Sequence, residues 1–123
     1  METDVGTRYV KAIAAKDHSA LLDLLDPAVD FRGLTPGRFW EATSAAEVVD
    51  EIILGKWFED RDHIDGIEHV ETDAVGGRHR IGYRYRVTNG DGSFLVEQQA
   101  YFDVVDGRIS WLRVMCAGFR PAG

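Results

Sequence analysis

The sequence between Arg78 and Gly118 contains three strand-like runs joined by two short turns that contain glycine. The turns lie at residues 89–92 (NGDG) and 106–107 (DG), and turns of this composition usually join neighbouring antiparallel strands. In the first run apolar or aromatic residues alternate with arginines, as expected for a strand with one buried face. The stretch therefore predicts an antiparallel meander around which the rest of the chain is organised.

A four-residue turn at residues 89–92 sets the register of the first hairpin. It places Tyr83 opposite Gln98 on the apolar face and Arg84 opposite Glu97 on the other face. Opposite charges across a ladder stabilise such a pair by roughly 0.2–1 kcal/mol. A shift by one residue would turn Arg84 onto the apolar face, which costs far more. The other predicted pairs are Tyr85 with Val96, Ile81 with Ala100, and Arg80 with Tyr101.

The second turn leaves two alternatives for the last strand. A two-residue turn at residues 106–107 would bring one set of side chains to the apolar face, namely Trp111, Arg113 and Met115. A three-residue loop with a bulge would bring the alternate set, namely Ser110, Leu112, Val114 and Cys116. We favour the second alternative because it buries three apolar residues and leaves Arg113 in solvent.

The N-terminal half mixes helices with strands. The predicted helices cover residues 4–16, 20–25 and 45–58, and the predicted strands cover residues 28–32 and 64–75. Asp4 and Thr3 are alternative caps of the first helix, Ser19 caps the second, and Ser44 with Glu47 has the pattern of a capping box. The predicted order is helix, helix, strand, helix and then four strands.

Composition narrows the class of protein. The chain has 123 residues, which suits one domain over residues 1–123, and a formal net charge of −7, which disfavours nucleic acid and anionic membranes as partners. Cys116 is the only cysteine, so an internal disulfide is impossible. The sequence has no N-terminal signal pattern and no apolar run near the ~18 residues of a membrane span. We therefore expect a cytoplasmic protein.

Several segments resemble the nuclear transport factor 2-like superfamily, in particular its SnoaL-like and ketosteroid-isomerase-like members. The opening of the chain, residues 8–10 (RYV) and 17–29, is similar to theirs, and so is the closing hairpin at residues 101–109. The resemblance implies an α+β fold of the cystatin-like roll type. In that fold a curved antiparallel sheet wraps around three helices and encloses a conical pocket.

The chemistry of these relatives does not carry over to this sequence. Tyr9 falls at the position of the oxyanion-hole tyrosine of the ketosteroid isomerases, but Arg32 or Gly33 stands at the position of their general base and Ala100 at that of their protonated aspartate. The acidic residue that SnoaL-like cyclases place on the last strand is absent from residues 112–118. The Asp–Arg–Asp arrangement of the related epoxide hydrolases has no match among the inward positions.

Two groups of polar residues are candidates for the interior. Tyr83 and Gln98 face each other on the apolar side, and because buried polar groups need partners they either bond each other or meet a ligand or water. Asp30 and Arg32 flank Phe31 on the short strand, so either Phe31 or the charged pair faces inward. In the second arrangement Arg32 would hold an anionic oxygen of a ligand.

Other candidate site residues stand alone, and each has either a functional or a purely structural role. Tyr9 either donates a hydrogen bond to a ligand oxygen or packs its ring in the core. His69 is a candidate general base, although a lone histidine among carboxylates on a strand is more often a surface residue. Trp40 lies in a predicted loop at residues 33–43 that would roof the pocket, either as a lid or as packing. The register adds three lining residues, namely Ala100, Val114 and Cys116.

These observations predict a domain that binds a small hydrophobic, oxygen-bearing ligand and leave isomerase, cyclase or dehydratase activity open. The alternative is a non-catalytic dimerisation or scaffolding module whose cavity is filled, and a pocket of roughly 300 Å³ or more would favour ligand binding. We expect a homodimer through the convex face of the sheet, because Trp111, Met115 and Tyr101 lie there among charged residues. We expect no metal and no cofactor.

Overall fold

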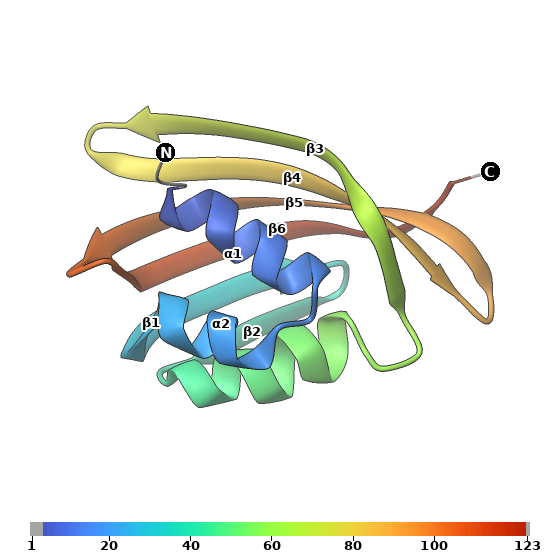
Figure 1. Ribbon diagram of the computed structural model, residues 1–123, viewed down its shortest axis with the longest axis horizontal. Coiled ribbons are helices and arrows are strands. Elements are labelled where there is room, and N and C mark those ends of the chain that lie inside the picture. Colours follow the sequence, from blue (N-terminus) through green and yellow to red (C-terminus); the bar gives the residue numbers. More distant parts are fainter. Residues whose placement is uncertain (1–3, 123) are drawn as a thin grey trace.

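A six-stranded mixed sheet packs its concave face against three helices in the computed structural model, which describes residues 4–122 (Figure 1). The strand order is β2-β1-β6-β5-β4-β3, and all neighbours are antiparallel except β1 and β6. The predicted α+β class and cone-like architecture are confirmed, with one parallel pair in the sheet. The helices are α1 (Val5–Ala14), α2 (His18–Leu24) and η1 (Glu47–Trp57). The strands are β1 (Leu25–Thr35), β2 (Arg38–Ala42), β3 (His63–Val75), β4 (Arg78–Asn89), β5 (Gly92–Val105) and β6 (Arg108–Pro121).

The register of the β4–β5 hairpin agrees with the sequence prediction at every predicted pair. Tyr83 pairs with Gln98, Arg84 pairs with Glu97, and the guanidinium of Arg84 donates to the Glu97 carboxylate at 2.7 Å. The apolar side chains of β4 face the helices and are buried, whereas its arginines lie on the outer face. This alternation places one row of aromatic and polar side chains in the core.

The hairpin between β5 and β6 combines features of both alternatives for the last strand. Its turn has two residues, because Val105 pairs with Arg108, and both turn residues have positive φ, as a type I′ turn requires. The predicted three-residue loop is therefore wrong. The predicted facing is nevertheless right, since Leu112 and Val114 are buried and Arg113 lies outside. A bulge at Ser110, beyond the turn, reverses the alternation.

The first two helices begin at acidic caps. Asp4 accepts a hydrogen bond from the backbone N–H of Thr7 at 2.9 Å, as one of the two predicted caps of α1, and Thr3 lies outside the described residues. Asp17 accepts from the N–H of Ala20 at 3.1 Å and caps α2, so the predicted cap Ser19 is wrong by two residues. The two helices pack their buried faces against the sheet.

The third helix, η1, is a π-helix rather than the predicted α-helix. The backbone N–H of Glu47 donates to Ser44 Oγ at 3.2 Å, which is one half of the predicted capping box. A Cβ atom at Gly55 would lie 2.3 Å from the carbonyl oxygen of Asp50, so glycine is required at this point of the widened helix. None of the helices that the structure describes is both long and apolar enough to cross a membrane.

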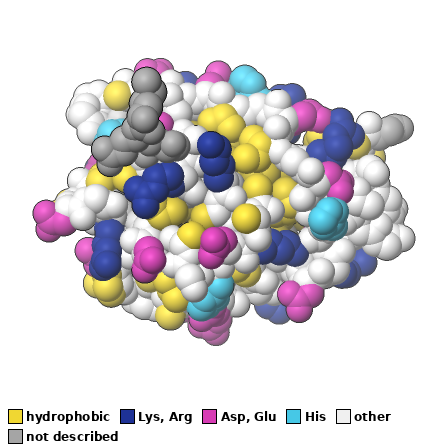
Figure 2. Space-filling view, in the orientation of Figure 1, with side chains coloured by type: hydrophobic (Ala, Val, Ile, Leu, Met, Phe, Trp, Pro, Cys, Tyr) yellow, Lys and Arg dark blue, Asp and Glu magenta, His cyan; other side chains and the backbone are white. Residues whose placement is uncertain are grey.

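The predicted loop at residues 33–43 is also wrong, because most of it forms a hairpin of β1 and β2. Gly33 pairs with Trp40 and Phe31 with Ala42, with Pro36 and Gly37 in the turn. The hairpin widens the sheet beyond the meander and places aromatic side chains on both of its faces. Figure 2 shows apolar side chains in the middle of one face of the molecule, with charged side chains of both signs around them.

Candidate functional site

A short chain of polar groups crosses the core beneath the helices. The Tyr83 hydroxyl donates to Oε1 of Gln98 at 2.8 Å, and both residues are 1% exposed. The two residues therefore bond each other, which is one of the two alternatives drawn from the sequence. The bond uses only the oxygen of the Gln98 amide, so its nitrogen remains available for another partner.

Tyr9 lies in the core on α1, with its ring edge-on to that of Tyr83 at a centroid distance of 6.5 Å. Its hydroxyl has no hydrogen-bond partner among residues 4–122. Burial raises the pKa of the Tyr9 phenol well above its ordinary value. The ring therefore carries a neutral hydroxyl that can donate a hydrogen bond but is held away from solvent.

Three buried polar groups lack a partner within the described part of the chain, and all three can donate hydrogen bonds. They are the Tyr9 hydroxyl, the Gln98 side-chain nitrogen Nε2 and the Trp57 indole nitrogen Nε1. A buried polar group without a partner costs about 1–3 kcal/mol. An interior with spare donors is suited to a molecule that brings a hydrogen-bond acceptor.

A cavity of about 180 Å³ lies between the β1–β2 hairpin, η1 and the ends of β5 and β6. Trp57 and Gln98, two of the three residues with unpaired donors, line this cavity. The indole of Trp40 packs edge-on against that of Trp57 at 6.2 Å and donates to Thr35 Oγ1 at 2.8 Å, so Trp40 is a fixed wall rather than a lid. The lining residues are Thr35, Trp40, Lys56, Trp57, Phe58, Val96, Gln98, Cys116, Gly118 and Phe119.

The cavity brings together three of the sequence-predicted residues, namely Trp40, Gln98 and Cys116. Tyr9, Tyr83, Ala100 and Val114 are buried in the core but do not line it. Among the described residues that line the cavity there is no Asp, Glu or His, and the one charged group is the exposed Lys56. The described lining therefore has aromatic walls and no carboxylate or imidazole that could act as a general base.

Two sequence-predicted residues lie on the other face of the sheet. Phe31 faces the core at 1% exposure, so the interior position considered for Arg32 is wrong, and its side chain is 54% exposed near Glu41. His69 pairs with the outward-facing Arg84 and lies near Glu71, with its side chain half exposed. Neither residue faces the interior, because strand alternation assigns them to the outer face.

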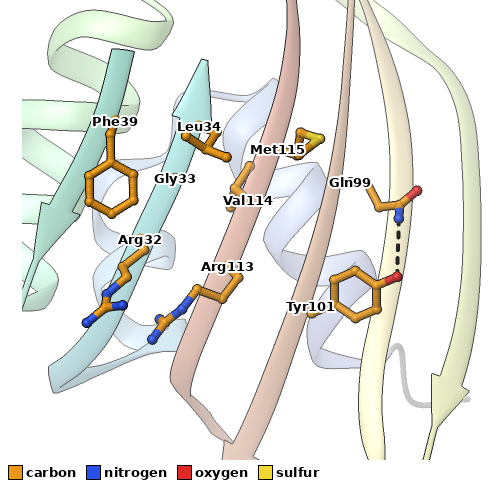
Figure 3. A pocket seen from close by; sticks show the side chains of 9 residues that line it. All are labelled: Arg32, Gly33, Leu34, Phe39, Gln99, Tyr101, Arg113, Val114 and Met115. Carbon is orange, nitrogen blue, oxygen red and sulfur yellow. Dashed lines mark hydrogen bonds between the residues drawn. The ribbon is translucent and has the colours of Figure 1, made fainter. Parts of the chain in front are cut away.

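A second and larger hollow, of about 370 Å³, lies on this outer face (Figure 3). Figure 3 shows Arg32 and Arg113 at one end and Phe39, Leu34 and Met115 at the other. Sequence reasoning missed the hollow because Leu34 and Phe39 were placed in a loop. The adjacent aromatic residues Phe39 and Trp40, one for each face of a strand, were the local signal for β2, and the charged Arg38 and Glu41 beside them weakened it.

The predicted dimer face has less exposed aromatic surface than the sequence implied. Arg78 lies over the Trp111 ring at 3.6 Å and Arg113 lies over it at 4.3 Å, so two guanidinium groups cover this indole. Met115, in contrast, is 61% exposed. Any association through this face would depend on Met115 and its apolar neighbours rather than on Trp111.

No family model and no curated protein matches this sequence, but many solved structures share its architecture. A candidate isomerase of Bacillus subtilis has a TM-score of 0.75 at 14% identity, over 91% of this chain and 83% of that chain. A nuclear transport factor 2-like protein of unknown function from Burkholderia pseudomallei has a TM-score of 0.65 at 19% identity, over 89% and 86%.

A third solved structure was determined with a small molecule. It is a protein of Catenulispora acidiphila with a ketosteroid isomerase-like fold, in complex with trimethylamine, with a TM-score of 0.69 at 12% identity over 93% of this chain and 85% of that chain. Identities this low bear on the fold alone. Together with the element order and the strand order of the sheet, these neighbours show that the chain has the fold of the nuclear transport factor 2-like superfamily.

Proposed function

We propose that this protein binds a compact, mostly apolar molecule that carries at least one hydrogen-bond acceptor. One observation supports the proposal above the others: Gln98 and Trp57 line the cavity, which is partly open to solvent, and each has a buried N–H group without a partner in the described chain. A carbonyl or ether oxygen of a ligand would satisfy these donors, while the aromatic walls would contact its apolar body. The bond from Tyr83 fixes the orientation of the Gln98 amide.

The size of the cavity limits the ligand. Its volume of about 180 Å³ is below the roughly 300 Å³ that would favour ligand binding over a filled cavity, so the proposal rests on the unpaired donors and not on the size of the cavity. It is slightly larger than the engineered cavity of roughly 150 Å³ that binds benzene. The cavity itself holds about one ring of a ligand, and a larger molecule would extend into solvent. The neighbour that binds trimethylamine is an example of this fold with a small ligand.

The chemistry of the lining favours binding over acid–base catalysis. A general base must lie within hydrogen-bond reach of the proton that it removes, and the described lining contains no carboxylate or imidazole. Isomerase, cyclase or dehydratase activity would therefore need a group from outside this cavity. We propose a binding domain whose selectivity comes from the position of Gln98 and Trp57.

The proposal is tested with two molecules of nearly equal shape, acetophenone and ethylbenzene, of which only the first has an acceptor oxygen. In a Trp111→Phe background, the fluorescence of Trp40 and Trp57 reports on the cavity that both line. We expect acetophenone to change this fluorescence and to raise the melting temperature more than ethylbenzene does. Cys116→Leu should fill the cavity and abolish both the fluorescence change and the rise in melting temperature. Ala117→Leu, a change at the neighbouring exposed residue on the outer face, should preserve both.

A non-catalytic dimerisation module is the second candidate function. The observation in its favour is the exposure of three large apolar side chains on the outer face, Leu34 at 45%, Phe39 at 51% and Met115 at 61%. Large apolar side chains gathered on one face are typical of interfaces. The two functions use opposite faces of the sheet, so the same protein can have both.

A further inference from the structure

The hollow on the outer face has no role in the proposed ligand binding at the cavity, and it lies on the face that the dimerisation candidate would use. Leu34, Phe39 and Met115 line it, and they are three of the six large hydrophobic residues that are exposed in the described chain. The volume of about 370 Å³ lies within the range of small-molecule sites. A concave region with this much exposed apolar surface indicates a binding site.

Two arginines lie side by side at the other end of the hollow. Arg32 on β1 and Arg113 on β6 are direct register partners, and Figure 3 shows their guanidinium groups on the same side of the hollow. Like charges directly opposite on neighbouring strands repel each other. The carboxylates of Asp30 and Glu41 already neutralise part of this repulsion, and an anion beside Arg32, the less tightly paired of the two, would neutralise more of it.

The two arginines differ in how many of their side-chain N–H groups already have partners in the protein. Arg113 Nη1 donates to the backbone oxygens of Asp30 at 2.9 Å and Leu112 at 3.1 Å, and lies 3.2 Å from the Asp30 carboxylate. The side chain of Arg32 makes no hydrogen bond within residues 4–122, and its contact with the Glu41 carboxylate is 3.8 Å long. Arg113 is thus a fixed neighbour, while the guanidinium of Arg32 has its donors free for a ligand.

We propose that this hollow binds a small amphipathic carboxylate. Its carboxylate group would accept two parallel hydrogen bonds from the Arg32 guanidinium, and its apolar tail would lie along Leu34, Phe39 and Met115. The net charge of −7 repels anions at a distance, so a single negative charge with a long apolar contact suits the site better than a polyanion does.

The carboxylate of Glu41, which lies near the Arg32 guanidinium, provides a direct test of the proposal. Both side chains are more than half exposed, and exposed pairs of this kind contribute little stability. A bound carboxylate would compete with Glu41 for the same guanidinium. Removal of the Glu41 charge should therefore tighten binding, which a purely hydrophobic groove would not show.

The experiment uses decanoate as the probe, below its micelle-forming concentration, and measures binding by calorimetry with 1-decanol as the uncharged control. We expect decanoate to bind more tightly than 1-decanol. Arg32→Gln should weaken decanoate binding about tenfold and leave 1-decanol unaffected, and Glu41→Gln should strengthen it. Arg86→Gln removes the same charge from the outer face of β4 and should leave the affinity unchanged.

Several outcomes would overturn the proposal. Equal binding of decanoate and 1-decanol, no heat of binding, or an affinity that Arg32→Gln does not change would each do so, provided that circular dichroism shows the variant to be folded. If Cys116→Leu lost decanoate binding while Arg32→Gln kept it, decanoate would be bound instead in the cavity that Trp57 and Gln98 line. A dimer that covers the face and does not respond to decanoate would assign the hollow to a second copy of the chain.

Discussion

The Tyr83 hydroxyl donates a hydrogen bond of 2.8 Å to Oε1 of Gln98 across two neighbouring strands in the middle of the core. Because the oxygen of the amide is occupied, only its nitrogen can bind another molecule, and that nitrogen belongs to a residue of the cavity lining. The register of the hairpin thus determines which end of the Gln98 amide is left without a protein partner. A ligand that reaches this nitrogen would have to bring a hydrogen-bond acceptor.

The first prediction concerns this bond. Tyr83→Phe removes the donor and leaves the buried oxygen of Gln98 without a partner, so the free energy of unfolding should fall by about 1–3 kcal/mol. Urea denaturation measures the change. Tyr101→Phe is the matched control, because Tyr101 is on the outer face and, within residues 4–122, its hydroxyl accepts a hydrogen bond from Gln99 alone, at 3.3 Å. An equal loss of stability in both variants would show that the buried Tyr83–Gln98 bond contributes no more to the free energy of unfolding than the exposed Tyr101–Gln99 bond does.

The second prediction compares two buried tyrosines with opposite hydrogen bonding. The Tyr85 hydroxyl donates to the backbone oxygen of Val10 at 2.7 Å, whereas the Tyr9 hydroxyl has no partner in the described chain. Tyr85→Phe should therefore lower the free energy of unfolding by about 1 kcal/mol or more. Tyr9→Phe should leave it unchanged or raise it, since an unsatisfied polar group is removed.

Thermal or urea unfolding of both variants decides the matter. Tyr9 does not line the cavity, so we expect Tyr9→Phe to bind acetophenone nearly as well as the unchanged protein does. A marked loss of stability in Tyr9→Phe would reveal a protein partner for its hydroxyl. A marked loss of binding alone would show that a ligand reaches deeper into the core than the cavity does.

The sequence predicts the meander because its information is local. The turns at residues 89–92 and 106–107, the alternation of β4 and the Arg84–Glu97 pair all specify one register and one inward face. The last strand shows the limit of this reasoning. Because of a bulge at Ser110, the length of the turn no longer determines which side chains of β6 face the core. Nothing in the local sequence pattern requires the extra residue there.

Features that depend on distant contacts were not predictable in this way. Strand β2 contains arginine and glutamate beside its aromatic residues, and the packing of Trp40 on Trp57 stabilises it from another part of the chain. The π-helical turns of η1 require Gly55 but share the apolar pattern of an α-helix. The choice between Phe31 and Arg32 as the inward residue also remained open until the pairing of β1 with β6 was known.

The third prediction concerns the activity of the ketosteroid isomerases that the sequence resembles. Gly33 faces inward, and a Cβ there would lie 2.9 Å from the Trp57 ring, so the position has no room for a carboxylate. Ala100 is buried without a polar group. We expect no appreciable double-bond isomerisation of a 3-ketosteroid, since loss of a general base alone removes a factor of roughly 10²–10⁴. Robust turnover in a spectrophotometric assay would contradict this and would identify a base elsewhere.

The fourth prediction concerns association through the outer face. We expect a homodimer at micromolar concentration in sedimentation velocity, with Met115 and Phe39 at the interface. Met115→Asp should shift the protein to the monomer, because it places a charge in the apolar contact, whereas Val105→Asp, a change of the same kind at another exposed site, should not. Decanoate should also favour the monomer, since both occupants need Met115. A monomer at all concentrations would refute the dimer.

The fifth prediction concerns alkaline pH. Burial raises the pKa of Tyr9, Tyr83 and Tyr85 above the ordinary value of 10.0 for a tyrosine. Above about pH 10 the unfolded chain releases these phenolic protons while the folded chain retains them. The contribution to stability is therefore complete below pH 10 and decreases as the pH rises beyond it.

Urea unfolding at a series of pH values tests this prediction. The free energy of unfolding should fall above about pH 10 by up to about 1.4 kcal/mol per pH unit for each buried phenol. In Tyr9→Phe the decrease in the free energy of unfolding per pH unit should be smaller by one such contribution. The decrease that remains in this variant measures the contribution of Tyr83 and Tyr85. Phenolate absorbance from the buried rings should appear together with the loss of folded structure. Ionisation of Tyr9, Tyr83 and Tyr85 in a protein that stays folded would show that solvent reaches the core.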